Sequence, residues 1–173
     1  NYLHERAKKL NRKKALLKVR PGILKFDDLS HFSNDASLEL PSTSHISIVD
    51  SYGNALSMTT TIENAFGSRL MTRGGFLLNN ELTDFSFRPQ KDGSPIANSI
   101  ERGKRPRSSM SPTIIKDNQN ELKLILGSPG GSRIIGYVLK TIIAHLDWGL
   151  DIQKSIELPN MVNRFGVFEI DFW

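Results

Sequence analysis

Residues 41–69, PSTSHISIVDSYGNALSMTTTIENAFGSR, contain the pattern that decides the fold. Apolar and polar residues alternate through HISIVD at 45–50 and again through ALSMTTTI at 55–62, and the turn sequence SYGN separates the two runs. Alternation with a period of two on both sides of a short glycine turn predicts a β-hairpin. Thr43 stands just before this hairpin, and three more threonines lie at its far end.

Further strands are predicted on the carboxyl side of this hairpin. The runs PTIIKD at 112–117 and LKLILGS at 122–128 flank the turn sequence NQNE and predict a second hairpin. The run GGFLLNN at 74–80 predicts a short strand. Residues 88–107 are rich in proline, glycine and charge, and we expect a loop there.

Helical periodicity follows the second hairpin. In RIIGYVLKTIIAHL, at 133–146, apolar residues recur at i, i+3, i+4 and i+7, which predicts a helix that faces the core. Another helix is predicted from Asp151, and VFEIDFW at 167–173 predicts a last strand. A helix is also predicted over 3–17, ended by the Arg-Pro-Gly sequence at 20–22. Hairpins followed by helices indicate an α+β fold with helices stacked on an antiparallel sheet.

Composition excludes several classes of protein and site. The 173 residues are 38% hydrophobic and contain no apolar run long enough to span a membrane. The absence of cysteine excludes disulfides, thiolate nucleophiles and cysteine-ligated metals. The four histidines show no metal-ligand spacing, so neither a metal nor another cofactor is predicted. The chain opens with NYLHERAKKL, which has no initiator methionine and no signal peptide, as in a piece of a longer protein.

The net charge of +5 comes from the amino-terminal segment. Residues 1–22 carry eight lysines and arginines against Glu5, a net of +7, whereas the remainder carries 15 basic and 17 acidic residues, a net of −2. Such a segment fits either a nucleic-acid-binding arm or a solvated helix face with acidic partners elsewhere. We favour the solvated face and predict no nucleic-acid partner, because no aromatic residues interleave as stacking platforms.

Two features point to chemistry. A mid-chain threonine hydroxyl has no base at hand, but an amino-terminal threonine has its own α-amine, whose pKa is about 8. Thr43 gains that amine if its hydroxyl attacks the carbonyl of Ser42 and water releases the resulting ester; the competing interpretation is an ordinary threonine that begins a strand. Gly130 and Gly131 open the predicted helix, where backbone N–H groups face an anion or form only a tight turn.

Four segments together resemble γ-glutamyltranspeptidases. They are TSHISIVDSYGNALSMTTTIENAFGSR, GGFLLNNELTDFS, KRPRSSMSPTII and LGSPGGSRII, and they occur in the order seen in that family. The resemblance covers residues 43 to about 166 closely and residues 1–42 loosely. It implies an N-terminal-nucleophile fold, a four-layer αββα sandwich, of which this chain holds the small-subunit part. Residues 1–42 are then the tail of the large subunit, and residues 43–173 the small catalytic subunit.

The resemblance also implies roles for individual residues. Thr43 falls at the nucleophile, Ser42 at the carbonyl that is cleaved, and Thr61 where a hydroxyl contacts the nucleophile. Gly130 and Gly131 fall at the oxyanion hole, which agrees with their position at a helix start. The residues that fall at the donor's amino-acid end are Glu81 and Asp84 for its ammonium, and Ser108 and Ser109 for its carboxylate.

Two departures from the family pattern concern the donor. Glu63 stands where well-studied members usually have asparagine at this end of the donor, and a carboxylate favours an ammonium. The donor is therefore open among glutathione, poly-γ-glutamate and another acyl compound. The family's large subunit also supplies an arginine for the donor's carboxylate. No residue of this chain is assigned to that role, and Arg107 only adjoins Ser108 in sequence.

The sequence therefore predicts a γ-glutamyl acyltransferase or hydrolase that acts through an acyl-enzyme on Thr43. Its partners would be a γ-glutamyl donor, water or an amino-acid or peptide acceptor, and the rest of the large subunit. Two alternatives stay open: a related acylase or poly-γ-glutamate-processing enzyme, and an inactive, unprocessed fragment with a binding role for its basic arm. Family resemblance implies a periplasmic or extracellular location.

Overall fold

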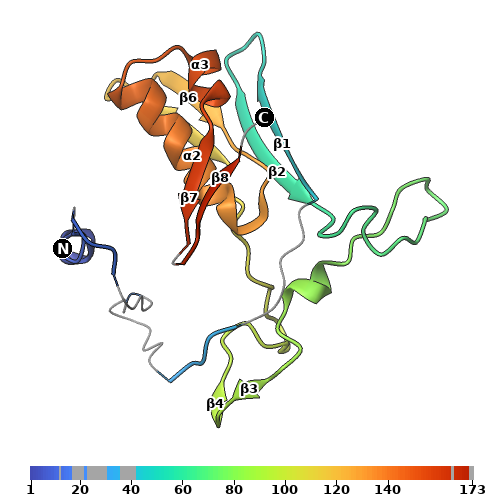
Figure 1. The fold of residues 1–173 in the computed structure, drawn as a ribbon. Coiled ribbons are helices and arrows are strands. Elements are labelled where there is room, and N and C mark those ends of the chain that lie inside the picture. The colour runs from blue at the N-terminus through green and yellow to red at the C-terminus, as the bar shows by residue number, and fades with distance from the viewer. Residues whose placement is uncertain (12, 17–21, 23–30, 36–41, 165, 172–173) are drawn as a thin grey trace.

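The predicted hairpin at the centre of the sequence is present. In the computed structural model, strand β1 (Thr43–Val49) pairs antiparallel with β2 (Ala55–Thr61), and the register sets Thr43 opposite Thr61 (Figure 1). The Asp50 carboxylate accepts the N–H groups of Tyr52 and Asn54 and so closes the turn. The structure describes residues 1–11, 13–16, 22, 31–35, 42–164 and 166–171.

The second predicted hairpin lies beside the first. Strand β5 (Thr113–Lys116) pairs with β6 (Leu122–Leu126) across a turn closed by the Asp117 carboxylate. The Ser57 hydroxyl, from β2, donates to the carbonyl oxygen of Leu126 over 3.0 Å. The polar face of β1–β2 therefore links the two hairpins through its side chains, while each hairpin remains a separate two-stranded sheet.

Helices cover one face of the second hairpin. A 3₁₀ turn (η2, Gly131–Arg133) leads into α2 (Ile134–Ile142), which continues as a π-helical turn (η3, Ile143–Asp147) and is followed by α3 (Ile152–Glu157). As predicted, a helix follows at Asp151, which is the N-cap of α3 and accepts the N–H groups of Gln153 and Lys154 with its carboxylate. The apolar stripe of α2 packs on β6, and the core consists of Leu124, Leu126, Ile134 and Val138.

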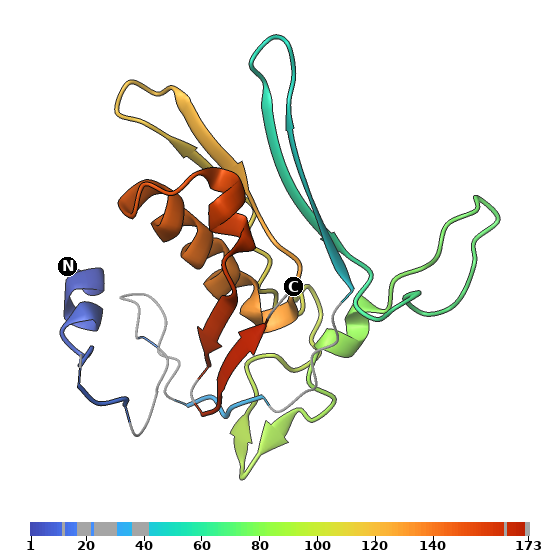
Figure 2. The same cartoon turned by 45° about the horizontal axis from the view of Figure 1, so that its top comes forward.

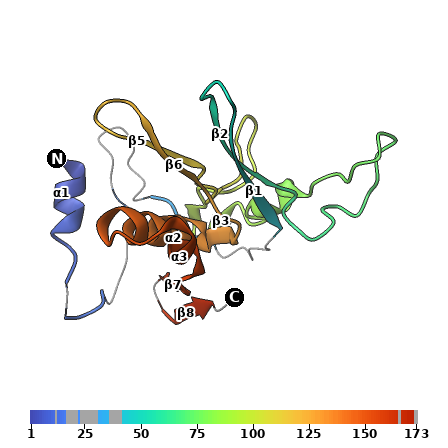
Figure 3. The same cartoon turned by 90° about the horizontal axis from the view of Figure 1, so that it is seen from above.

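A third hairpin packs against α2. Strand β7 (Asn160–Asn163) pairs with β8 (Phe168–Asp171), and the sequence predicted only the second of these. Figure 2 shows this hairpin alongside α2, and Figure 3 shows the helices between it and the β1–β2 and β5–β6 hairpins. The last two residues of the predicted strand at 167–173 lie outside the described residues.

The architecture is α+β: α2 and α3 lie between the β7–β8 hairpin on one side and the β1–β2 and β5–β6 hairpins on the other, and the described strands pair as separate two-stranded sheets (Figure 3). This matches the fold class predicted from the sequence and corresponds to part of an αββα sandwich. In the described part of the chain, no helix has both the length and the apolar character that a membrane span requires.

The helix predicted over 3–17 is wrong in extent. Helix α1 spans only Tyr2–Ala7 and buries none of its residues. Beyond it, the Asn11 side chain accepts the N–H groups of Lys13 and Lys14, a local bond that competes with helical hydrogen bonding. The Lys8 ammonium pairs with Glu5 within the segment, 2.7 Å away. The predicted end of the helix at 20–22 lies largely outside the described residues.

Two further expectations need correction. Residues 74–80 do not form a strand; only an isolated bridge joins Met71 and Leu77, because Gly75 at φ +81° belongs to a tight turn. Residues 88–107 are not wholly irregular, since β3 (Gln90–Lys91) pairs with β4 (Ser94–Pro95).

Candidate active site

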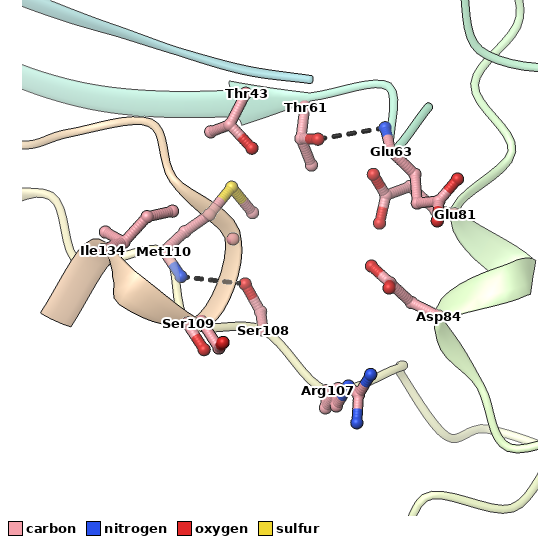
Figure 4. Close-up of a pocket in the computed structure, with 12 residues that line it drawn as sticks. Thr43, Thr61, Glu63, Glu81, Asp84, Arg107, Ser108, Ser109, Met110 and Ile134 are labelled. Carbon is pink, nitrogen blue, oxygen red and sulfur yellow. Dashed lines mark hydrogen bonds between the residues drawn. The ribbon is translucent and has the colours of Figure 1, made fainter. Parts of the chain in front are cut away.

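A small cavity of about 50 Å³ lies where the first hairpin ends. Thr43 begins β1 and Thr61 ends β2, so the hairpin register places both side chains at its mouth, as Figure 4 shows. The other lining residues come from four segments: Glu63, Glu81, Asp84, Arg107, Ser108, Ser109, Met110, Gly131, Ser132 and Ile134. Residues far apart in sequence thus meet beside the Thr43 and Thr61 side chains.

Thr61 connects the strand end to the peptide bond before Thr43. Its hydroxyl donates to the carbonyl oxygen of Ser42 over 3.2 Å, and its oxygen accepts the N–H of Glu63 over 3.0 Å. The N–H of Ile62 also points to the Ser42 carbonyl, at 3.4 Å. We expected the Thr61 hydroxyl to contact the nucleophile. While the Ser42–Thr43 peptide bond is intact, it instead donates to the Ser42 carbonyl.

Carboxylates form one wall of the cavity. Glu81 and Asp84 lie at the two ends of a 3₁₀ turn (η1, Glu81–Asp84). Such a turn has three residues per turn, which sets residues i and i+3 on the same side and supplies the bend that both side chains need to face the cavity (Figure 4). Burial and the neighbouring charge of Asp84 raise the pKa of the Glu81 carboxyl above its ordinary value.

Glu63 belongs to the same wall and is almost fully buried, with 3% of its surface exposed. The Asn80 side-chain amide donates to the Glu63 carboxylate and to the Thr83 hydroxyl, while its oxygen accepts the N–H of Asn64. Asn80 therefore satisfies the backbone N–H of Asn64 and also fixes Glu63. The backbone of Glu63 has φ +69°, a left-handed conformation in which asparagine is far commoner than glutamate.

Hydroxyl groups form the opposite wall. Ser108 accepts the N–H of Met110 over 3.3 Å, and the carbonyl of Ser109 accepts the Ser111 hydroxyl over 2.9 Å. Met110 also packs against the core cluster formed by β6 and α2. The serine segment is therefore anchored to the hydrophobic core, which gives its hydroxyls a fixed place beside the cavity.

The glycine pair lies at the turn between β6 and α2. Gly130 has φ +133°, and a Cβ atom there would lie 2.8 Å from the Tyr137 ring. Both the backbone conformation and the space thus require glycine at this position. Gly131 follows as the first residue of η2 and lines the cavity. A turn of this kind presents backbone N–H groups to an oxyanion.

The cavity gathers most of the residues expected from the sequence. Two stand just outside its lining: Ser42, whose carbonyl is held by Thr61, and Gly130, which precedes the lining residue Gly131. Four lining residues were not predicted as site residues: Arg107, Met110, Ser132 and Ile134. Arg107, Met110 and Ser132 directly flank predicted residues, Ile134 follows Gly131 by three residues, and all four lie within the quoted motifs, which is the signal that would have found them.

Metal-binding side chains do not cluster in the described part of the chain. Among the residues that the structure describes, no group of three or more histidine, aspartate or glutamate side chains has the arrangement to hold a metal ion. The His45 ring contacts the hydroxyls of Thr59 and Ser47, and burial lowers the pKa of His45. The His145 ring contacts the carbonyl of Leu150 at 2.8 Å. Both histidines thus make contacts within the protein.

Comparison with known proteins agrees with these features. The gamma-glutamyltranspeptidase family model matches residues 1–171. The glutathione hydrolase proenzyme of Bacillus subtilis is 42% identical over 120 residues, or 69% of this chain and 19% of the relative. The proenzyme of Escherichia coli is 38% identical over 166 residues, or 90% of this chain and 26% of the relative. The chain thus spans about a fifth to a quarter of these relatives.

Solved structures give the same result. The chain resembles the T380A mutant of Helicobacter pylori gamma-glutamyltranspeptidase with a TM-score of 0.63 and 43% identity. The match covers 73% of this chain and 72% of that one. Sequence, fold and the placement of the shared motifs around one cavity agree, and this chain is a member of the gamma-glutamyltranspeptidase family.

Proposed function

We propose that the protein containing this chain transfers or hydrolyses γ-glutamyl groups through an acyl-enzyme on Thr43. The observation that carries the proposal is the common cavity of Thr43, the carboxylates Glu81 and Asp84, the serines at 108–109, and Gly131. One site then contains a nucleophile, a turn that stabilises an anion, carboxylates that can bind an ammonium and hydroxyls that can bind a carboxylate.

The first step in this proposal is self-cleavage. The Thr43 hydroxyl attacks the carbonyl carbon of Ser42, the C–N bond breaks, and the Ser42 acyl group moves from the Thr43 nitrogen to its oxygen. Water then hydrolyses the ester, which leaves a carboxylate on Ser42 and a free amine on Thr43. The hydrogen bonds from Thr61 and Ile62 to the Ser42 carbonyl support this step, because they polarise the carbonyl that is attacked.

The second step uses the new amine as the base. It takes the proton from the Thr43 hydroxyl as the oxygen attacks the γ-carbonyl of the donor. The tetrahedral oxyanion then faces the backbone N–H groups of the Gly130–Gly131 turn, and the leaving amine receives a proton as the acyl-enzyme forms. Water or an amine acceptor attacks that ester, so the same site gives hydrolysis or transfer.

The cavity walls suit the amino-acid end of such a donor. Glu81 and Asp84 would pair with its ammonium, and Ser108 and Ser109 would donate to its carboxylate. Glutathione is the donor that the relatives' names indicate, and we propose it or a similar γ-glutamyl amide here. The remainder of the large subunit would be the partner that completes the site, and no cofactor is needed.

Trapping the acyl-enzyme tests this proposal. The full-length protein is mixed briefly with a γ-glutamyl anilide, quenched in acid and weighed by mass spectrometry. We expect the fragment that begins at Thr43 to gain one γ-glutamyl group, whereas Thr43→Ala gains none. Thr59→Ala, on the same hairpin but outside the cavity lining, serves as the control and should still be labelled. Absence of label on wild-type protein that has been cleaved and releases no anilide would contradict the proposal.

A further inference from the structure

Arg107 places a cation in the cavity that the family resemblance did not assign. It lines the cavity next to Ser108, at the end beyond Asp84 in Figure 4. About 31% of its side chain is exposed, so the guanidinium is neither buried in the core nor fully in solvent. The cavity therefore has carboxylates on one wall and, where the serines are, a permanent positive charge.

Asp35, which precedes the Ser42–Thr43 bond in the sequence, forms an ion pair with Arg107. Its carboxylate accepts from the Arg107 guanidinium over 3.1 Å, and only 11% of the Asp35 side chain is exposed. The same carboxylate oxygen accepts from the Asn98 amide over 2.7 Å. A charged hydrogen bond in such a partly buried position is stronger than an exposed ion pair and fixes the side chain.

Asn98 ties the two walls of the cavity together through the backbone. Its amide nitrogen also donates to the carbonyl of Asp84 over 2.7 Å, and its oxygen accepts the N–H of Arg107 over 2.9 Å. The backbones of Asp84 and Arg107 are thus both bonded to one side chain. The spacing between the two ends of the cavity is set by this amide.

The segment that carries Asp35 is itself docked on the protein. Ser33 donates its N–H to the carbonyl of Pro95 over 2.8 Å and its hydroxyl to the carbonyl of Lys91 over 3.1 Å. It also forms a parallel bridge with Ile96, which is 3% exposed. These contacts keep Asp35 beside Arg107 independently of the peptide bond at Ser42.

We propose that Arg107 is a specificity-determining residue of the cavity: it binds the α-carboxylate of the donor's glutamyl group, and Asp35 is the positioning residue that orients its guanidinium. This inference rests on the proposed γ-glutamyl function. A guanidinium presents five N–H groups in a planar fork, so it pairs with two carboxylates at once, one from the protein and one from the ligand. The ligand class is a zwitterionic γ-glutamyl compound with a free α-carboxylate.

Binding of L-glutamate and of its α-amide, isoglutamine, separates this contact from the rest of the site. The two ligands differ only at the α-carboxylate, and calorimetric titration of the full-length protein needs no turnover. We expect wild type to bind L-glutamate more tightly than isoglutamine. Arg107→Gln should weaken the binding of L-glutamate about tenfold, equal to ~1.4 kcal/mol, and the binding of isoglutamine less than twofold. Arg107→Lys keeps the charge without the fork and should give an intermediate loss.

Two further variants complete the design. Arg105→Gln removes an exposed arginine two residues away and should change neither affinity. Asp35→Asn should weaken L-glutamate severalfold, and the Asp35→Asn/Arg107→Gln double variant should be no worse than Arg107→Gln alone, because Asp35 acts through Arg107. A merely structural Asp35 would lower the melting temperature of the protein without changing the preference between the two ligands.

The outcomes are distinct. Equal weakening of both ligands by Arg107→Gln, no weakening of either, or no preference in the wild type would overturn the inference. A wild-type protein that prefers L-glutamate through Arg107 but never forms the acyl-enzyme would contradict the proposed function and leave the carboxylate contact standing.

Discussion

The Thr61 hydroxyl donates to the carbonyl oxygen of Ser42 over 3.2 Å, and the two residues are brought together by the register that pairs Thr43 with Thr61. The carbonyl before Thr43 is thereby fixed at the edge of the cavity, while the Thr43 side chain points into it (Figure 4). The hairpin geometry thus places the Ser42 carbonyl, a hydrogen-bond donor to it and the Thr43 hydroxyl, which we propose as the nucleophile, at one end of the hairpin.

The first prediction concerns cleavage at this bond. We expect the folded full-length protein to split between Ser42 and Thr43, and Thr43→Ala to stay intact because it lacks the attacking oxygen. Thr43→Ser keeps that oxygen and should still be cut. Intact mass and amino-terminal sequencing of the smaller product measure this. A product that begins with any sequence other than TSHISIV would rule out Thr43 as the nucleophile.

The second prediction concerns the donor's ammonium. Removing one partner of a charged pair inside the cavity leaves the other without compensation, so Asp84→Ala should lose ~2–4 kcal/mol of transition-state stabilisation, or about 30- to 1000-fold in kcat/KM. Steady-state assays with a γ-glutamyl anilide measure the change. Asp92→Ala, in the exposed turn between β3 and β4, is the matched control. An unchanged kcat/KM in Asp84→Ala would remove this residue from the site.

The third prediction follows from the raised pKa of Glu81. The protonated form cannot pair with an ammonium, and it persists to higher pH than in an ordinary glutamate. The acid limb of kcat/KM should therefore fall at a higher pH than for an unperturbed glutamate. Glu81→Gln should lose this limb and reach a lower plateau. A wild-type profile without that limb, or one unchanged by Glu81→Gln, would contradict the assignment.

The Glu81 carboxyl should affect stability with the opposite pH dependence from its effect on kcat/KM. Because the carboxyl pKa is higher in the folded than in the unfolded protein, the contribution of Glu81 to stability is present at acid pH and is lost as pH rises through the folded-state pKa. Glu81→Gln should therefore melt at a higher temperature than wild type near neutral pH, and this difference should shrink on acidification. Thermal unfolding across pH measures it without any assay of activity.

The sequence was sufficient to predict the elements whose hydrophobic pattern matches the period of the strand or helix that forms. The alternation in 45–62, the turn residues and the 3.6-residue period in 133–146 each predict an element that the structure contains. It failed where no burial supports the pattern: the basic segment after Ala7 has helix-forming residues, but α1 buries none of its side chains. The glycines at 74–75 turn the chain where their apolar neighbours suggested a strand.

The site was predictable in its members but not in its connections. The quoted motifs named the threonines, carboxylates, serines and glycines that the structure brings together or sets beside the cavity. The link from Asp35 through Asn98 to Arg107 joins positions 63 and 72 residues apart, and no local pattern encodes such a pairing. The interactions that orient the site therefore required the fold.

The fourth prediction concerns the Gly130–Gly131 turn, which we propose as the oxyanion site. Gly130→Ala places a Cβ atom against the Tyr137 ring at a φ of +133°, so the turn must shift. We expect a stability loss of about 1–3 kcal/mol and a fall in kcat larger than the rise in KM, because the displaced N–H groups act mainly in the transition state. Gly53→Ala has φ +84° but open space around it, so it should cost stability alone. An unchanged kcat in Gly130→Ala would exclude the turn from catalysis.

The outer face of the first hairpin carries apolar side chains. Ile46 pairs with Met58 and Ile48 with Leu56, and these four side chains are 41%, 39%, 50% and 44% exposed, respectively. The polar face of the same hairpin, with Ser57, is the one turned toward β6. An apolar sheet face of this kind requires a covering layer, and the matches to this chain make up only 19% and 26% of the two relatives. We expect the second sheet of the sandwich to lie on it.

The last prediction is that residues 1–173 by themselves turn over γ-glutamyl amides very poorly, even when folded and cleaved. The uncovered face should bind a hydrophobic dye and promote self-association, and the full-length protein should show neither.

In the full-length protein, Ile48→Asp should weaken the association of the two cleavage products, because it buries an unpaired charge between the layers. Tyr52→Asp, at the exposed turn of the same hairpin, should leave it unchanged. Comparing kcat/KM of the 173-residue chain with that of the full-length protein measures the requirement for the remaining layers. Equal values would mean that the donor site is complete within these residues and that the exposed apolar face has no catalytic partner.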